Sequence, residues 1–287
     1  MKRPTSVLLV VAALLSCAPA MAQGTLDRIR ERGEFRIGYR QDARPLSFEE
    51  EGKPAGYSID LCRRIAAEVS DHLSLPGMKA VYVPVTAESR FDALVKGDID
   101  IECGATTITL GRLEQVDFTL MTFVTGGSFL SRADSRVGSA ADLAGKRVAV
   151  MRDTSTATAL QAYLTENRID ARVVQVESRD TGMQRLQRGD VDAFAGDQIV
   201  LLGAALGALE KDQAANFSFA DELFSYEPYG FMVRRNDADF RLVVNRALAE
   251  LFRDGDQAPI YQEWVGSNGV KPSPMLIAMY LVQGLSE

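Results

Sequence analysis

Arginine and hydroxyl side chains recur directly after the segments that have the pattern of β-strands. Arg40 follows a first predicted strand, Arg90 opens a helix after a second, and Thr107 and Arg112 follow a third. The carboxyl ends of parallel strands meet at one edge of a sheet, where helix N-termini and backbone N–H groups face a crevice. A guanidinium presents a planar fork of donors that matches a carboxylate. The pattern therefore predicts a ligand-binding edge that is rich in positive charge.

The second half of the chain repeats this arrangement with other side chains. Thr154 and Ser155 follow a predicted strand at 147–151, Arg179 follows the next strand, and Asp197 follows the third. A single arginine is usually a solvated surface group, and Arg179 lies in a polar run that also suits this alternative. Several polar groups at successive strand ends favour a shared cleft instead.

Common catalytic systems are missing from the sequence. His72 is the only histidine, and it falls near the end of an amphipathic segment, where a surface position is expected. The sequence has no zinc-type spacing of cysteine and histidine, no phosphate-binding G-x-x-x-x-G-K-[ST] loop and no G-x-S-x-G turn. We therefore expect a binding site and not a nucleophilic or metal-dependent enzyme.

An internal repeat indicates how these residues are positioned. The segment LVKGDIDIECG at 94–104 returns as LQRGDVDAFAG at 186–196, with Leu, Gly, Asp, Asp and Gly at matching places. Each copy predicts a helix that ends at a left-handed glycine, a turn opened by Asp, and a short strand that runs to a second glycine. Two unrelated turns are the alternative. A unit used twice predicts two lobes that face one cleft.

The hydrophobic pattern predicts two α/β series. The first has strands at 35–39, 80–85 and 99–103, helices at 57–72 and 90–96, and a turn-rich loop from 44 to 56. The second has strands at 147–151, 172–176 and 191–195 and helices at 156–167 and 183–188. Both series have the strand and helix alternation of a parallel sheet.

Two extended segments, 123–132 and 226–235, separate the series and predict two crossings between the lobes. Helices at 237–253 and 258–265 would then complete the first lobe. These limits assign 24–124 and 229–287 to lobe 1 and 125–228 to lobe 2. The apolar segment PMLIAMYLVQGL at 274–285 is too short to span a membrane, and we expect a helix docked on the lobe surface.

The N-terminus has the three-part layout of a secretory signal. Lys2 and Arg3 precede an apolar run at 7–15 and an A-x-A site that ends at Ala22. This predicts a signal peptide at 1–22 and a periplasmic protein. Leu14-Leu15-Ser16-Cys17 offers an alternative, because it resembles the lipobox of lipoproteins anchored at Cys17.

Charge and cysteine content limit the partners and the chemistry. The chain has 39 acidic and 32 basic residues, and this balance argues against nucleic acid. Cys62 and Cys103 remain after either cleavage, in a compartment where disulfides persist. A helix lying on a strand could bring them within bonding distance, and two buried free thiols are the alternative.

Several motifs together carry a family resemblance. YRQDARPLSF, GYSIDLCRRIA, IECGATT with Arg112 beyond it, DFT, DTSTA and YGFMVRR occur in the order seen in periplasmic amino-acid-binding proteins of solute-binding protein family 3. The chain resembles this family from about 25 to 265. The resemblance implies a type II periplasmic binding protein fold, in which two α/β lobes, each a parallel-rich sheet flanked by helices, are joined by two crossing strands. It also implies a monomer that delivers one amino acid to an ABC transporter permease.

The resemblance also implies roles for individual residues. Arg112 matches the arginine that binds the ligand α-carboxylate, helped by Thr107 and by backbone N–H groups around Thr154 and Ser155. Asp197 matches the carboxylate that receives the α-ammonium group. A zwitterion needs both charges met on leaving water, since burying either one unpaired costs several kcal/mol. No cofactor and no metal ion are expected.

The implied side-chain specificity is acidic. Arg40, Arg90 and the segment that contains Ala105 are similar to the glutamate and aspartate binders of the family, in which further arginines meet the second carboxylate. The chain departs from that subgroup where Ala87 and Ala105 stand in place of serines and Arg179 in place of a histidine. An extra arginine still favours an anionic side chain, so glutamate or aspartate is the expected ligand.

Two other functions use the same fold. Periplasmic cyclohexadienyl dehydratases resemble this family and would need a positioned acid to expel a hydroxyl group; Glu102 is the acid nearest the cleft by sequence. A ligand-sensing partner of a membrane receptor would use identical binding residues, so the sequence does not separate it from a transport protein.

Overall fold

The structure is a computed structural model that describes residues 23–135, 137–210, 217–220 and 222–286. The signal peptide predicted at 1–22 and the alternative anchor Cys17 lie outside the described residues. The helices are α1 (Thr25–Arg32), α2 (Tyr57–Leu73), α3 (Arg90–Lys96), α4 (Leu110–Leu113), α5 (Ser155–Glu166), α6 (Arg179–Arg188), α7 (Gln198–Glu210), α8 (Ala238–Asp254), α9 (Gln257–Trp264) and α10 (Pro274–Gln283). The strands are β1 (Glu34–Arg40), β2 (Asp42–Ala43), β3 (Ser47–Glu50), β4 (Lys53–Ala55), β5 (Lys79–Val85), β6 (Ile101–Glu102), β7 (Val116–Arg132), β8 (Arg147–Met151), β9 (Arg172–Val176), β10 (Ala193–Asp197), β11 (Phe217–Phe219) and β12 (Ser225–Arg234).

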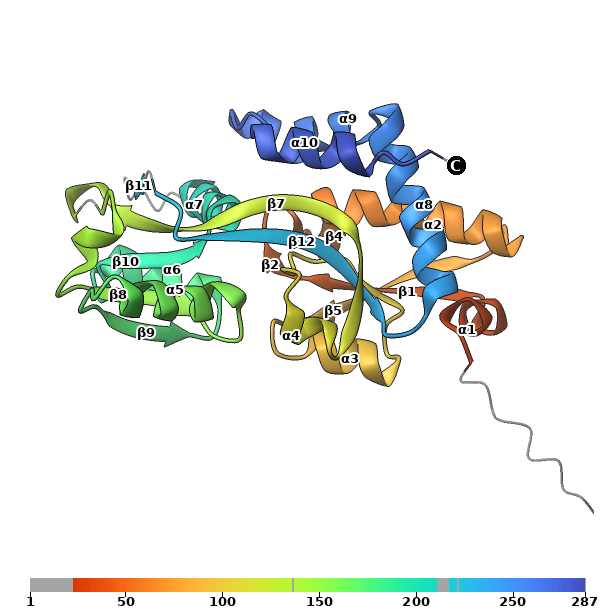
Figure 1. The fold of residues 1–287 in the computed structure, drawn as a ribbon, viewed down its shortest axis with the longest axis horizontal. Helices are drawn as coiled ribbons and strands as arrows, with labels where there is room; N and C mark the ends of the chain where they lie inside the picture. Colours follow the sequence, from red (N-terminus) through yellow and green to blue (C-terminus); the bar gives the residue numbers. More distant parts are fainter. Residues whose placement is uncertain (1–22, 136, 211–216, 221, 287) are drawn as a thin grey trace, which may run out of the picture.

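Two α/β lobes lie side by side and share the crossing strands β7 and β12 (Figure 1). Nine of the strands form one sheet in the order β5-β1-β6-β12-β7-β10-β8-β9, with β11 beside β7. The outer three strands of each lobe are parallel, whereas β12 and β7 pair antiparallel with each other and with their neighbours. The predicted lobe limits, 124/125 and 228/229, fall inside these two crossing strands.

The crossing strands pack tightly against each other at a pair of glycines in β7. A Cβ added to Gly126 would lie 2.7 Å from the Ser225 carbonyl oxygen, and one added to Gly127 would lie 2.5 Å from Ser225 Oγ. Any larger residue at either position would clash with the start of β12. The glycines therefore allow both crossings to run together between the lobes.

Each lobe has its own buried core. In lobe 1 the α2 stripe predicted from the sequence packs inward, and Ile65 and Val69 are fully buried. In lobe 2, Val148 and Val150 of β8 pack with Leu160 of α5. Each such side chain stabilises the fold by roughly 1.5–3 kcal/mol. The structure also joins Cys62 of α2 to Cys103 after β6 in a disulfide, with the Cα atoms 6.4 Å apart.

The repeated sequence serves the same structural purpose in both lobes. Gly97 and Gly189 end α3 and α6 in the left-handed conformation, with φ of 81° and 75°. The second Asp of each copy then binds the backbone of a neighbouring strand: Asp100 Oδ2 accepts the Arg36 N–H at 2.9 Å, and Asp192 Oδ2 accepts the Arg147 N–H at 2.8 Å. The repeat therefore fixes strand register at the edge remote from the strand ends that were predicted to bind ligand.

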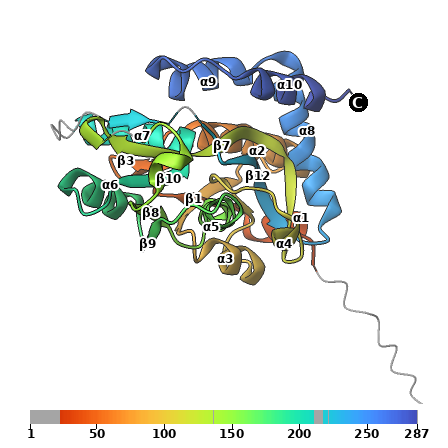
Figure 2. The same cartoon turned by 60° about the vertical axis from the view of Figure 1, so that its left-hand side comes forward.

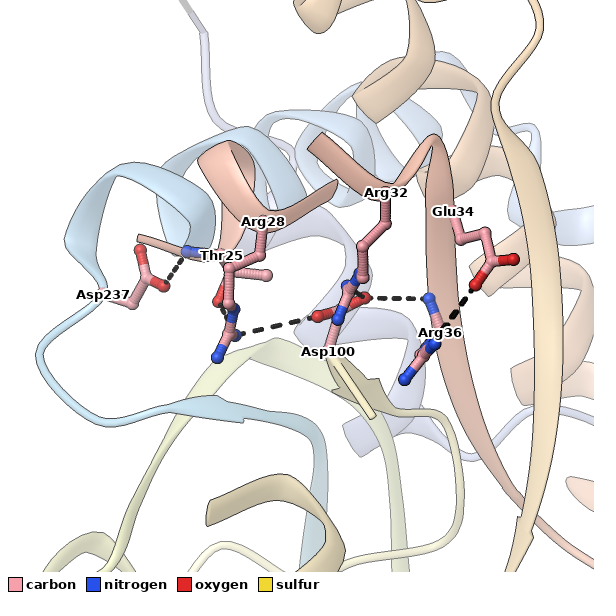
Figure 3. A network of polar contacts seen from close by, with 7 residues as sticks. All are labelled: Thr25, Arg28, Arg32, Glu34, Arg36, Asp100 and Asp237. Atoms are coloured by element: carbon pink, nitrogen blue, oxygen red, sulfur yellow. Dashed lines mark hydrogen bonds and ion pairs between the residues drawn. The ribbon is translucent and has the colours of Figure 1, made fainter. Parts of the chain in front are cut away.

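Asp100 is the centre of a larger polar network in lobe 1 (Figure 3). Its carboxylate is fully buried, accepts a hydrogen bond from Arg32 Nη2 at 2.6 Å, and lies 3.7 Å from Arg28 Nη2. The same network ties the start of α1 to the cap of α8, because Thr25 N donates to Asp237 at 2.7 Å. Asp100 thus joins α1 to the sheet.

Some elements differ from the sequence-based expectation. The segment expected as a turn-rich loop contains the small antiparallel sheet β2-β3-β4, and α6 begins at Arg179, four residues before the predicted start. The sequence analysis also missed α1, which is short and mostly charged, and α7. The apolar residues of α7 surround the helix instead of forming one stripe, so the helical period is not visible in the sequence.

The apolar C-terminal segment forms helix α10, docked on lobe 1 beside α8 and β7, as both views show (Figure 1, Figure 2). The Gln283 side chain accepts from Met121 N at 2.7 Å and donates to Met121 O at 2.9 Å on β7. The docked helix is therefore confirmed. Within the described part of the chain, no helix is both long and apolar enough to cross a bilayer.

We predict that Asp100→Ala lowers the free energy of unfolding by about 3 kcal/mol, because a buried N–H and two arginines lose their acceptor. Asp98→Ala is the matched control, since Asp98 is exposed in the same turn and should change stability by less than about 0.5 kcal/mol. Urea unfolding of both variants measures the difference. Equal losses for the two would show that the network does not stabilise the fold.

Candidate functional site

The nine residues predicted to bind ligand all line one cavity between the lobes. The predicted residues on its wall are Arg40, Arg90, Ala105, Thr107, Arg112, Thr154, Ser155, Arg179 and Asp197. The strand ends of both lobes therefore meet at one cavity, as the sequence pattern predicted.

Secondary structure explains why these side chains converge. Arg40 ends β1, Arg90 and Arg179 are the first residues of α3 and α6, and Asp197 ends β10. Thr154 caps α5, with its hydroxyl accepting the Ala157 N–H at 3.1 Å. Each of these positions lies at the carboxyl end of a strand or at the start of the helix that follows it.

The wall of the cavity also has an apolar part, which was not predicted from the sequence. Met151, Phe194, Val200 and Leu201 line the cavity from the lobe 2 side. Val200 and Leu201 belong to α7, which also packs against lobe 1: a Cβ added to Gly203 would lie 2.1 Å from the Arg44 carbonyl oxygen. The lobes are therefore in direct contact beside the cavity.

Arg90 carries the least compensated charge in the site. Its side chain is 2% exposed, Nε is buried without a partner, and in the described residues its guanidinium forms no hydrogen bond or ion pair. Burial lowers the pKa of Arg90 to about 10, Glu102 opposes this shift, and Arg112 and Arg179 add to it. Because an unpaired buried charge costs several kcal/mol, an anion in the cavity would stabilise this group.

Arg40 is also buried but has a partner that the sequence analysis missed. Asp42 accepts from Arg40 Nη2 at 2.7 Å and from Arg179 Nη1 at 2.9 Å. Burial would raise the pKa of Asp42, but Arg179 and Arg40 hold it below its usual value. Burial likewise lowers the pKa of Arg40 to about 10. Asp42 of lobe 1 thus binds one arginine from each lobe and connects them.

Arg112 lies beside Thr107. Its Nη1 donates to the Thr107 carbonyl oxygen at 2.7 Å, and burial lowers its pKa, while Glu227 and other acids oppose that shift. In the described part of the chain its remaining guanidinium nitrogens make no hydrogen bond, so they are available to a ligand carboxylate.

Two further polar residues, Glu227 and Tyr229, lie on β12. They belong to the hinge, the region where the crossing strands β7 and β12 connect the lobes. Glu227 accepts hydrogen bonds from the hydroxyls of Thr107 at 2.6 Å, Ser225 at 2.7 Å and Ser155 at 2.8 Å. Burial raises the pKa of Glu227, Asp197 adds to this, and the hydroxyl donors oppose it.

The Tyr229 hydroxyl donates to Asp197, which also accepts from Thr156. The sequence offered a signal for both hinge residues, because strand alternation places Glu227 and Tyr229 on one face of the YEPYG segment.

Glu102 does not line the cavity. It is fully buried and accepts from the Thr106 hydroxyl at 2.9 Å, behind the wall. His72 is exposed in the last turn of α2. Among the described residues, no group of His, Cys, Asp and Glu is arranged to hold a metal ion.

Comparison with known proteins places the chain among binding proteins. Residues 35–267 match the family described as bacterial extracellular solute-binding proteins, family 3. The L-glutamate/L-aspartate-binding protein of Pseudomonas aeruginosa is 34% identical over 260 residues, which cover 89% of this chain and 85% of that protein.

Solved structures of amino-acid-binding proteins are also similar to this chain. An ancestral arginine-binding protein bound to arginine matches with a TM-score of 0.71 and 30% identity, over 82% of this chain and 99% of that one. An ancestral amino acid-binding protein, a precursor of cyclohexadienyl dehydratase, matches with a TM-score of 0.71 and 29% identity, over 84% of this chain and 99% of that one. The type II periplasmic binding protein fold expected from the sequence is confirmed.

We predict that Asp42→Ala opens the lobes in the absence of ligand. The change removes the acceptor that Arg40 and Arg179 share and leaves their like charges facing each other, so the closed form should lose about 1–3 kcal/mol. Small-angle X-ray scattering should show a larger radius of gyration than for the wild type. Glu50→Ala is the control, since Glu50 pairs with Arg44 within lobe 1. An unchanged radius for Asp42→Ala would contradict the role of the bridge.

Proposed function

Because the chain belongs to the bacterial extracellular solute-binding proteins of family 3, we propose that it captures an amino acid with an anionic side chain, glutamate or aspartate, between its two lobes. It then delivers this amino acid to the permease of an ABC transporter. The protein acts in the periplasm as a monomer, after removal of a signal peptide at 1–22, and requires no cofactor.

The observation that carries this proposal is the unpaired guanidinium of Arg90 on the cavity wall. Four arginines line the cavity, but only one carboxylate, Asp197, lines it with them. A ligand carboxylate beside Arg90 and Arg40 would replace lost hydration with charge-assisted hydrogen bonds, each contributing roughly 1.5–3 kcal/mol. A neutral side chain would leave Arg90 uncompensated.

The backbone of the ligand has its own partners. Arg112 binds the α-carboxylate, together with the N–H groups of Thr154 and Ser155 at the start of α5, where the helix dipole favours negative charge. Asp197 receives the α-ammonium group. The apolar wall from Met151, Phe194 and Leu201 contacts the methylene carbons.

Arg179 contributes less to specificity than the sequence suggested. Arg179 shares Asp42 with Arg40, at 2.9 Å and 2.7 Å, so the two arginines together leave only one positive charge for a ligand. Recognition of the side-chain carboxylate therefore rests on Arg90, with Arg40 beside it. Arg179 therefore does not compensate for the two hydroxyl groups that are lost where Ala87 and Ala105 stand in place of serines.

The relative from Pseudomonas aeruginosa supports an acidic ligand, since its name gives L-glutamate and L-aspartate. Binding is favoured over dehydratase chemistry because Glu102, the acid nearest the cleft by sequence, lies behind the cavity wall. No observation favours a sensory role over transport, and both roles would use the same closed form.

We predict that Arg90→Met reduces the preference for L-glutamate over L-glutamine by about tenfold to a hundredfold, because the amide is a neutral isostere of the side-chain carboxylate. Calorimetric titration of both ligands measures this preference. Arg152→Met is the control: Arg152 is a half-exposed arginine that pairs with Glu88 and does not line the cavity. If Arg90→Met weakens both ligands equally, Arg90 has no part in recognising the side chain.

We predict that Arg112→Ala abolishes binding of every amino acid, because the α-carboxylate is common to all of them. The melting temperature without ligand should stay near that of the wild type, since the Arg112 side chain makes only one hydrogen bond in the described protein, to Thr107 O. Near-normal affinity in a folded Arg112→Ala protein would rule out the assigned orientation of the ligand.

A further inference from the structure

We propose that Glu227 fixes the hydroxyl protons of Thr107 and Ser155, so that both oxygens accept hydrogen bonds from the ligand α-ammonium group. Glu227 is then a positioning residue that acts through these two hydroxyls. The inference rests on the proposed function, because it concerns how the same cleft recognises an amino acid.

Glu227 is held rigidly by both crossing strands. It is 2% exposed, and one carboxylate oxygen, Oε1, accepts from Ser225 Oγ at 2.7 Å. Ser225 Oγ in turn accepts the Gly127 N–H of β7 at 3.2 Å. The other oxygen, Oε2, is left to the cleft residues. The direction of this carboxylate is therefore set by the hinge.

The two hydroxyls at Oε2 have no proton left for a ligand. Thr107 Oγ1 donates to Oε2 at 2.6 Å. Ser155 Oγ lies 2.8 Å from Oε2 and 2.9 Å from Thr107 Oγ1, so its single proton goes to one of these two oxygens. A hydroxyl has one proton and two lone pairs, so a hydroxyl that donates to a carboxylate can only accept elsewhere. Thr107 and Ser155 line the cavity, whereas Glu227 does not. Toward the ligand, both residues therefore present acceptors.

These two acceptors line the same cavity as Asp197. Ser155 is adjacent to Thr156, which donates to Asp197, and Tyr229 donates to Asp197 from the strand that carries Glu227. Three acceptor groups, from Asp197, Thr107 and Ser155, match the three N–H donors of an ammonium group. Asp197 adds to the raised pKa of Glu227, and a cation bound between the two carboxylates relieves their repulsion.

This inference revises one role implied by the family resemblance. Thr107 was expected to help bind the α-carboxylate, but its hydroxyl proton is used by Glu227. The α-carboxylate is then left to Arg112 and to the backbone N–H groups of Thr154 and Ser155. The two halves of the zwitterion are thereby separated into a donor side and an acceptor side.

The test is Glu227→Met with two probes, L-glutamate and 2-oxoglutarate, which has a keto oxygen in place of the ammonium group. Methionine offers the hydroxyls no carboxylate, so even if Ser155 donates to Thr107 at 2.9 Å, at least one hydroxyl proton turns toward the cavity. We expect the Kd of L-glutamate to rise at least tenfold. We also expect the ratio of the 2-oxoglutarate Kd to the L-glutamate Kd to fall at least tenfold, by calorimetric competition.

A smaller change in the ratio overturns the inference, including the case in which both ligands weaken equally, since a merely structural role would produce that result. Glu222→Met is the matched control. Glu222 is an exposed residue that precedes β12 and is bonded to the Tyr163 hydroxyl at 2.8 Å, and its replacement should leave the ratio within threefold of the wild type. If Glu227→Met does not fold, Thr107→Val removes one acceptor and should lower the same ratio.

Wild-type binding separates this inference from the proposed function. Binding of L-glutamate or L-aspartate supports the proposed function whatever the result for Glu227→Met. If the wild type binds only another amino acid, the acidic assignment fails, and the ratio is measured with that amino acid and its 2-oxo acid. If it binds no amino acid, both proposals fail.

Discussion

The site depends on one constraint: four guanidinium groups line one cavity, those of Arg40 and Arg90 are almost fully buried, and each needs an acceptor. Asp42 serves Arg40 and Arg179, and a carbonyl oxygen serves Arg112. Arg90 lies against the ring of Phe91 but has no hydrogen-bond acceptor among the described residues. An anionic ligand would compensate the positive charge that remains. Binding of such a ligand and closure of the lobes would therefore favour each other.

The scaffold places these charges at the ends of parallel strands. The repeated Gly-Asp unit fixes strand register far from the cleft, through Asp100 and Asp192. The opposite ends of the same strands carry the side chains that line the cavity. The crossing strands add a third group of residues, because Glu227 and Tyr229 of β12 contact hydroxyls and a carboxylate from the cleft. The hinge is therefore part of the site as well as the connection between lobes.

Local patterns predicted the two lobes, their crossings and the nine cavity residues, since strand ends and helix starts follow from hydrophobic period and turn residues. The contacts missed were those between distant segments. Asp42 lies 137 positions from Arg179, and nothing near either residue in the sequence indicates the pair. Glu227 could have been found from strand alternation, but its donor Thr107 is 120 positions away. Helix α7 was not predicted because apolar residues surround it, so its sequence shows no helical period.

The central claim is that the uncompensated charge at Arg90 selects an anionic amino acid. The most direct test is a thermal-shift panel of the twenty amino acids, with prephenate added, on the chain from residue 23 onward, because a ligand bound only by the folded state raises the melting temperature. The account predicts the largest rise for L-glutamate or L-aspartate, and little for their amides. A largest rise with a neutral or cationic amino acid, or with prephenate alone, would contradict it.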